Sequence, residues 1–212
     1  DNSGGCVMWC NTNDLRGFRG IYRYNIFQND MTKHGVIDWR PNHKESMAYN
    51  NSFYFGELPE DVSSRRFMNN GYANGASEAK FYNNIFYNLD EFELNTFNEQ
   101  EIDWERNIFY GFDAVPSNDS TVITEDPKFV APGTGKFGLD SVTGYKLQND
   151  SPAINAGINI EENGGRDYFG TSLLDGQTDI GAAEFAVEGS MGTIVLHYVD
   201  ADGNTLRKDR TL

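Results

Sequence analysis

With 212 residues, of which 38% are hydrophobic and 14% aromatic, the chain is long enough to enclose one sizeable core with a small appendage. Its formal net charge of -15 argues against binding to nucleic acid or to an anionic membrane surface, because the long-range field repels polyanions. No stretch approaches the roughly 20 consecutive apolar residues of a membrane span, so we expect no membrane insertion.

A short phrase of the form Asn-Ile-Phe or Asn-Ser-Phe returns four times in the first half of the chain. Its asparagines are Asn25, Asn51, Asn84 and Asn107, at spacings of 26, 33 and 23 residues, and the residue two places after each is Phe. A repeat of this length, with one short β-prone run and one polar residue per unit, is typical of a solenoid of stacked coils. The sequence therefore predicts an all-β solenoid.

Short apolar runs separated by Asn, Asp, Gly and Pro carry this repeat, and each has the length of a strand. We expect strands at residues 4–9, 20–27, 35–39, 48–55, 79–87 and 104–110. Side chains alternate between the two sides of a strand, so Ile26, Ile85 and Ile108 are predicted to point to one side and the phenylalanines to the other. Both sets are apolar, and periodicity does not say which side faces the core.

The four aligned asparagines have two interpretations. Identical amides in stacked coils can hydrogen-bond along the stack at the ~4.8 Å strand spacing and so stabilise it. They could instead line a groove that binds sugars. We favour the structural ladder.

From residue 113 to residue 186 the pattern loosens into loops that contain a series of short phrases. They are Asp126-Pro127-x-Phe129, Ser151-Pro152-Ala153-Ile154-x-Ala156-Gly157 and Asp179-Ile180-Gly181-Ala182-x-Glu184. This series resembles the C-terminal end of extracellular right-handed parallel β-helix proteins, the superfamily of pectate lyases and of the alginate and chondroitin lyase group. The resemblance implies a right-handed parallel β-helix over residues 1–186 with a loop-rich C-terminal closure. Such proteins include lyases, hydrolases, epimerases and proteins without an assigned reaction, so the fold does not give the activity.

After a short linker at residues 187–191, residues 192–212 are predicted to form a β-hairpin tail around the Asp202-Gly203 turn. The segment from Gly192 to Leu206 resembles the opening of a MucBP repeat, a module of Gram-positive cell-wall proteins that is associated with mucin binding. The resemblance implies an extracellular, cell-wall-attached protein. Because the rest of that module is missing from the chain, its binding function cannot be carried over.

The densest group of reactive side chains lies between residues 30 and 45. Hydrolysis of a glycoside needs two carboxylates about 5 to 10 Å apart, and Asp30 with Asp38 could supply them. A lyase needs a base and a cation that neutralises the uronic acid carboxylate, and His34 or Lys33 with Arg40 could supply these. The alternative, which we favour, is a solvated loop whose charges pair with one another.

Aromatic rings offer flat faces for sugar rings, and the candidates for stacking are Trp39, Tyr54, Tyr87 and Trp104. His43, close to Trp39 in the sequence, is a further candidate for ligand binding. Trp104 is the best candidate for a surface position, because charged residues flank it. For each aromatic residue, burial in the core is the competing interpretation.

These observations lead to two hypotheses of function. With 17 basic against 32 acidic residues, a polyuronate is an unfavourable ligand and a neutral glycan fits better. The first hypothesis is a cell-surface β-helix that engages polysaccharide or host glycoprotein glycans, with hydrolytic or lyase activity contributed by coils upstream of this piece as one option. The second is a non-enzymatic adhesin or stalk module. No cofactor and no specific metal site are predicted, calcium remains an option for so acidic a surface, and the oligomeric state is left open.

Overall fold

A computed structural model of the chain describes residues 8–10, 20–29, 37–39, 46–57, 67–69, 79–90, 94, 102–136, 139–173, 176–186, 195–199 and 205–209. The side chains of 8–10, 37–39, 68–69, 139–140, 195–199 and 205–209 are not part of this description. Within these ranges the protein is all-β with parallel sheets, as expected, and its single described helix is the 3-10 helix η2 (Leu139–Tyr145).

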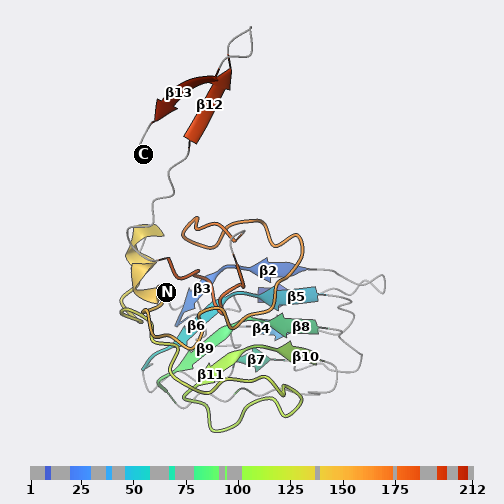
Figure 1. Cartoon of the computed structure of the whole chain (residues 1–212). Coiled ribbons are helices and arrows are strands. Elements are labelled where there is room, and N and C mark those ends of the chain that lie inside the picture. The colour runs from blue at the N-terminus through green and yellow to red at the C-terminus, as the bar shows by residue number, and fades with distance from the viewer. Residues whose placement is uncertain are drawn as a thin grey trace.

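Two four-stranded parallel sheets form the centre of the structure (Figure 1). In spatial order, the first contains β10 (Ile102–Glu105), β8 (Ala79–Tyr82), β5 (Ser46–Tyr49) and β2 (Ile21–Arg23). The second contains β11 (Ile108–Tyr110), β9 (Ile85–Asn88), β6 (Ser52–Phe55) and β3 (Ile26–Gln28). The chain thus visits the two sheets in turn, one strand of each per repeat.

A third parallel sheet is built from β1 (Met8–Cys10), β4 (Ile37–Trp39) and β7 (Met68–Asn69). Two further strands, β12 (Val195–Val199) and β13 (Thr205–Asp209), pair antiparallel near the C-terminus. This pairing agrees with the hairpin predicted for residues 192–212.

The single strands expected around each asparagine phrase are wrong, because each run is divided into two strands by a bend. The residue just before each ladder asparagine has a left-handed backbone, with φ of 51° at Tyr24, 51° at Asn50, 54° at Asn83 and 56° at Arg106. A left-handed residue cannot continue a strand, so the chain turns there from the first sheet to the second. Asparagine tolerates this conformation better than most residues, and it occupies two of the four positions.

The predicted asparagine ladder is confirmed. The Oδ1 atom of Asn84 accepts hydrogen bonds from the backbone N of Asn51 at 3.1 Å and from its Nδ2 at 2.9 Å. Asn107 Oδ1 accepts the same pair of bonds from Asn84, and Asn51 Oδ1 accepts them from Asn25. Since the Nδ2 atoms also donate to backbone carbonyls, the ladder satisfies polar groups that burial would otherwise leave unpaired.

The phenylalanines of the repeat form a stack between the two four-stranded sheets. The rings of Phe27 and Phe53 are 4.7 Å apart, those of Phe53 and Phe86 are 5.0 Å apart, and those of Phe86 and Phe109 are 4.6 Å apart, all nearly parallel. Trp104 of the first sheet packs against this stack, 5.7 Å from Phe109. This stack is the core, so the phenylalanines point inward.

The isoleucines point to the other side of the second sheet, where Ile85 and Ile108 are buried and Ile26 is partly buried. Ile85 and Ile108 are fully buried because residues of the C-terminal segment, among them Phe129 and Ile180, cover that side. The segment is held by hydrogen bonds from Asn50 Nδ2 to the carbonyls of Asp179 at 2.8 Å and Gly181 at 3.2 Å. The second sheet is therefore a middle layer with apolar packing on both sides.

Candidate functional site

The first sheet differs from the second because it presents polar side chains outward. Along its strands the residues alternate between the core and the outside, as the burial patterns of β8 and β10 show. We call this outward side the polar face. Six of its side chains are polar, namely Arg23, Tyr49, Lys80, Tyr82, Asp103 and Glu105, and two are apolar, Ile21 and Met47; Tyr49 is buried. Parallel pairing places them in two rows that cross the strands.

A hydrogen bond from the Tyr82 hydroxyl to Asp103 Oδ2 lies on the polar face. It joins neighbouring strands diagonally, since Lys80 is the residue in register with Asp103 and Glu105 is in register with Tyr82. Burial raises the pKa of the Tyr82 phenol, and the hydrogen bond to Asp103 and the charges of Asp103 and Glu105 raise it further. The phenol therefore stays protonated at neutral pH and acts as a donor, not as a general base.

Two carboxylates, those of Asp103 and Glu105, lie two residues apart on the outward side of β10. Their Cα atoms are about 6.6 Å apart at the usual rise of a strand. Lys80 on the neighbouring strand and Arg23 on β2 bring two positive charges to the same face. The polar face is thus charge-balanced on a chain whose formal net charge is -15.

Arg23 is held at the end of the polar face by a loop of the C-terminal segment. Its Nη1 donates to the carbonyl of Glu162 at 3.0 Å and to the Tyr49 hydroxyl at 3.4 Å. The backbone of Gly164 also lies against the guanidinium, because a Cβ built on this glycine would be 2.5 Å from Nη1. This loop forms one border of the polar face.

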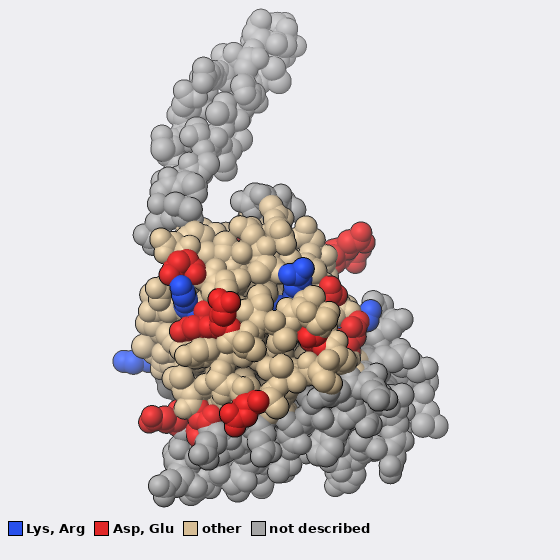
Figure 2. All heavy atoms as spheres, turned by 60° about the horizontal axis from the view of Figure 1, so that its bottom comes forward, with Lys and Arg blue, Asp and Glu red and all other residues tan. Residues whose placement is uncertain are grey.

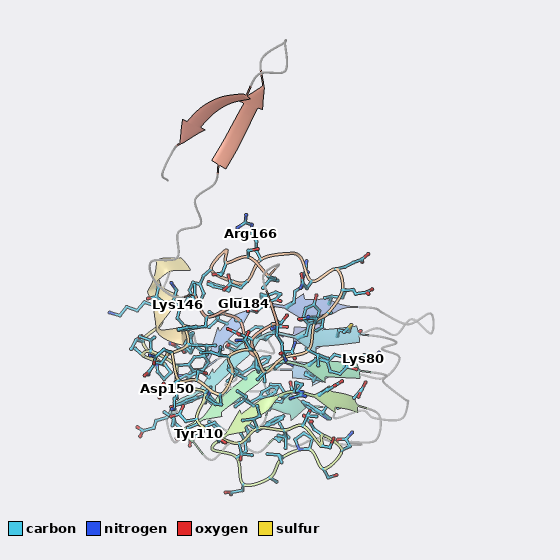
Figure 3. The ribbon with its side chains drawn as sticks, in the orientation of Figure 1. Lys80, Tyr110, Lys146, Asp150, Arg166 and Glu184 are labelled. Carbon is cyan, nitrogen blue, oxygen red and sulfur yellow. The ribbon has the colours of Figure 1, made fainter. Side chains whose placement is uncertain are left out.

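Acidic residues outnumber basic residues in the chain, 32 to 17. Figure 2 shows more Asp and Glu side chains than Lys and Arg side chains on the side of the molecule that it presents. In Figure 3, Lys80 lies at one side of the sheets and Asp150 at the other. Asp150 forms an ion pair with Lys128 at 2.6 Å, so this exposed pair is remote from the polar face and suits a control.

Several of the candidates from the sequence fall outside the part of the chain that the structure describes. Asp30, His34, Arg40 and His43 lie outside the described residues. Asp38 and Trp39 belong to β4, where their backbone pairs with β1 in the third sheet. A shared catalytic site for this group remains a prediction.

The expectation of a surface position for Trp104 is wrong. Its side chain is 3% exposed and stacks on Phe81 at 4.6 Å, because it occupies an inward position of β10. Tyr54 is also buried, with its ring 5.6 Å from that of Tyr87 and 5.9 Å from that of Tyr145. Neither ring offers a face to a sugar in this structure.

The sequence did contain a signal for the polar face, although composition alone hides it. Its side chains occupy the positions two and four residues before each ladder asparagine, which are outward once the strands alternate. Lys80 and Tyr82 are such a pair, and Asp103 and Glu105 are another. The high density of charged residues in residues 30–45 indicated a different candidate site in the sequence.

No family model matches the chain. No curated protein shows significant similarity to it. Among the residues that the structure describes, no three His, Cys, Asp or Glu side chains are grouped so that they could hold a metal ion. Within the same ranges, none of the helices has the length and apolar character needed to cross a bilayer.

Proposed function

We propose that this protein is a right-handed parallel β-helix of an extracellular, cell-wall-attached protein, and that it engages neutral polysaccharide or glycoprotein glycans along its polar face. The parallel sheets, the alternation of the chain between them and the asparagine ladder support the β-helix. The location at the cell wall rests on the resemblance of residues 192–206 to a MucBP repeat.

The observation that carries glycan engagement is the row of hydrogen-bonding groups across the strands of the polar face. Lys80 and Tyr82 bring donors, and Asp103 and Glu105 bring acceptors, on strands that repeat every ~4.8 Å. A polymer rich in hydroxyl groups can meet both kinds of group along such a row. Balanced charge on this face suits a neutral chain better than a polyuronate.

A second candidate function, a non-enzymatic adhesin or stalk, is favoured by the internal bonding of the same groups. The Tyr82 hydroxyl is already paired with Asp103, and Arg23 is already paired with the Glu162 carbonyl. Polar groups that form hydrogen bonds with one another need no ligand to satisfy them. A stalk needs only a polar surface that is solvated by water.

An array of neutral, uronate and amino glycans tests the proposal with the full chain and four variants. Tyr82→Phe, Lys80→Ala and Asp103→Asn change the polar face, and Lys128→Ala breaks the remote ion pair as the control. We expect each of the first three to weaken binding about tenfold, the effect of one lost hydrogen bond of about 1.4 kcal/mol. The control should bind like the wild type.

Each outcome of this experiment separates the two functions. Unchanged binding by all three face variants would place the ligand elsewhere, and a chain that binds no glycan would favour the stalk. A depolymerisation assay on every glycan that binds distinguishes binding alone from cleavage. Glu105→Gln is added for this assay. Loss of cleavage in Asp103→Asn and Glu105→Gln at glycan concentrations that saturate binding would assign an acid–base role to this pair.

A further inference from the structure

The loop that borders the polar face contains the dipeptide Asn163-Gly164, in a segment without regular secondary structure. Three of its residues have left-handed backbone conformations, with φ of 55° at Glu162, 92° at Gly164 and 75° at Gly165. Asn163 is half-buried and Gly164 is exposed. Solvent therefore reaches the junction between the two residues.

We propose that Asn163 is a site of spontaneous deamidation that changes the charge at the edge of the polar face. The backbone nitrogen of Gly164 attacks Cγ of Asn163, a new C–N bond forms, and the bond from Cγ to Nδ2 breaks. Ammonia leaves with the proton of the attacking amide, and a five-membered succinimide ring remains. Solvent water then opens the ring at either carbonyl and yields aspartate or isoaspartate, so the step needs no oxidant or cofactor.

The geometry of the loop prepares this attack. The backbone N of Gly165 donates a hydrogen bond to Asn163 Oδ1 at 2.9 Å. This bond folds the carboxamide back over the Gly164 amide that lies between the two residues. The same hydrogen bond draws electron density from Cγ and stabilises the negative charge that develops on Oδ1 during the attack. Because Gly164 has no Cβ, nothing on that residue hinders the approach.

The asparagines of the ladder provide a contrast within the same chain. Asn51 is followed by Ser52, a small residue that also permits ring closure, but its side chain is fully buried. Its Nδ2 is held by the Tyr22 carbonyl and by Asn84 Oδ1, at 3.0 and 2.9 Å. The strand that begins at Ser52 fixes the attacking amide in a hydrogen bond to the Asn25 carbonyl at 2.9 Å. Deamidation at Asn51 should therefore be suppressed by the fold.

The product changes the surroundings of Arg23. Nη1 of this residue already contacts the Glu162 carbonyl, and the Gly164 backbone lies against the guanidinium. A carboxylate at position 163 adds a negative charge beside one of the two cations of the polar face. The charge balance of the face then shifts toward acidic.

The test is peptide mapping by mass spectrometry on the full chain during prolonged incubation at mildly alkaline pH. Two other Asn-Gly pairs, Asn70-Gly71 and Asn74-Gly75, lie outside the described residues, so each site must be read from its own peptide. Short synthetic peptides around Asn163 and Asn51 give the rates without the fold. An isoaspartate-specific methylation assay identifies the rearranged product.

We expect Asn163 in the folded chain to convert at a rate within about tenfold of its peptide, while Asn51 stays intact in the fold and converts in its peptide. Asn163→Gln should remove the methylation signal that maps to this loop, because glutamine would need a larger ring. The aspartate product should co-elute with Asn163→Asp on an anion exchanger. Persistence of the Asn163 amide after its peptide has converted would overturn the proposal, whether or not the polar face binds a glycan.

Discussion

Replacement of Asn84 by alanine tests the contribution of the asparagine ladder to stability. The Asn84 side chain takes part in four hydrogen bonds: two from Asn51 to its Oδ1, and two from its Nδ2 to Asn107 Oδ1 and to the Ala48 carbonyl. Alanine removes all four. The Asn51 Nδ2 and Asn107 Oδ1 atoms keep other partners, namely the Tyr22 carbonyl and the Asn84 backbone N.

One buried backbone group, the Asn51 N–H, loses its partner in this variant, and the Ala48 carbonyl, which belongs to the β5–β8 pairing, loses the hydrogen bond from the Asn84 side chain. Each buried group left without a partner costs about 1–3 kcal/mol. We therefore expect Asn84→Ala to lower the free energy of unfolding by about 3 kcal/mol. This is a large fraction of the about 5–15 kcal/mol that is typical of a domain.

Urea denaturation followed by far-UV circular dichroism measures this change. Asn25→Ala is the matched control, because Asn25 lies at the end of the ladder, is half-buried, and donates from Nδ2 to Asn51 Oδ1 and the Arg23 carbonyl. It should cost about 1 kcal/mol, the usual net value of a hydrogen bond. Equal losses at Asn84 and Asn25, or a loss at Asn84 below about 1 kcal/mol, would refute the reasoning that the ladder is needed to satisfy buried backbone.

Three further predictions concern buried hydroxyls, pH and a glycine. Tyr24→Phe should leave stability unchanged or raise it by about 1 kcal/mol, since its buried hydroxyl has no hydrogen-bond partner in the described part of the structure. Tyr145→Phe should cost about 1–2 kcal/mol, because its hydroxyl accepts a hydrogen bond from the Gly133 N–H and donates one to Gln28 Oε1; urea melts compare the two variants. Burial raises the pKa of the Tyr87 phenol from 10.0 to about 12. The stability that this group contributes is therefore complete below pH 10 and should be lost between pH 10 and pH 12. The free energy of unfolding, measured as a function of alkaline pH, tests this, and Tyr87→Phe should reduce the loss. Gly181→Ala should cost about 2 kcal/mol of stability, because φ is 102° at this glycine and a Cβ would lie 2.6 Å from the buried Ile85. The control Gly176→Ala has open space around the added Cβ and should be near neutral; thermal melts compare the two.

Much of the architecture follows from the repeated asparagine phrase. Its spacing predicts stacked strands, and the identity of the polar residue predicts the ladder that Asn51 and Asn84 form. The bend before each of these asparagines is harder to foresee, because Tyr24 and Arg106 occupy the same left-handed position as Asn50 and give no local signal for it.

The burial of both sides of the second sheet depends on contacts that are distant in sequence. Ile85 packs beneath residues near Ile180, and no periodicity within a single strand records such a partner. The same limit explains the misplacement of Trp104. Its charged neighbours Asp103 and Glu105 do point outward, but alternation turns the ring between them into the core.

The C-terminal cover of the second sheet has a consequence for the order of folding. Asn50 bonds to carbonyls that lie 129 and 131 residues further along the chain, and contacts of such long sequence separation form slowly. On a ribosome or an export pathway, the strands that carry Ile85 and Ile108 emerge well before the residues that cover them. Until those residues arrive, an apolar β-surface is open to other chains, and aggregation competes with folding during this interval.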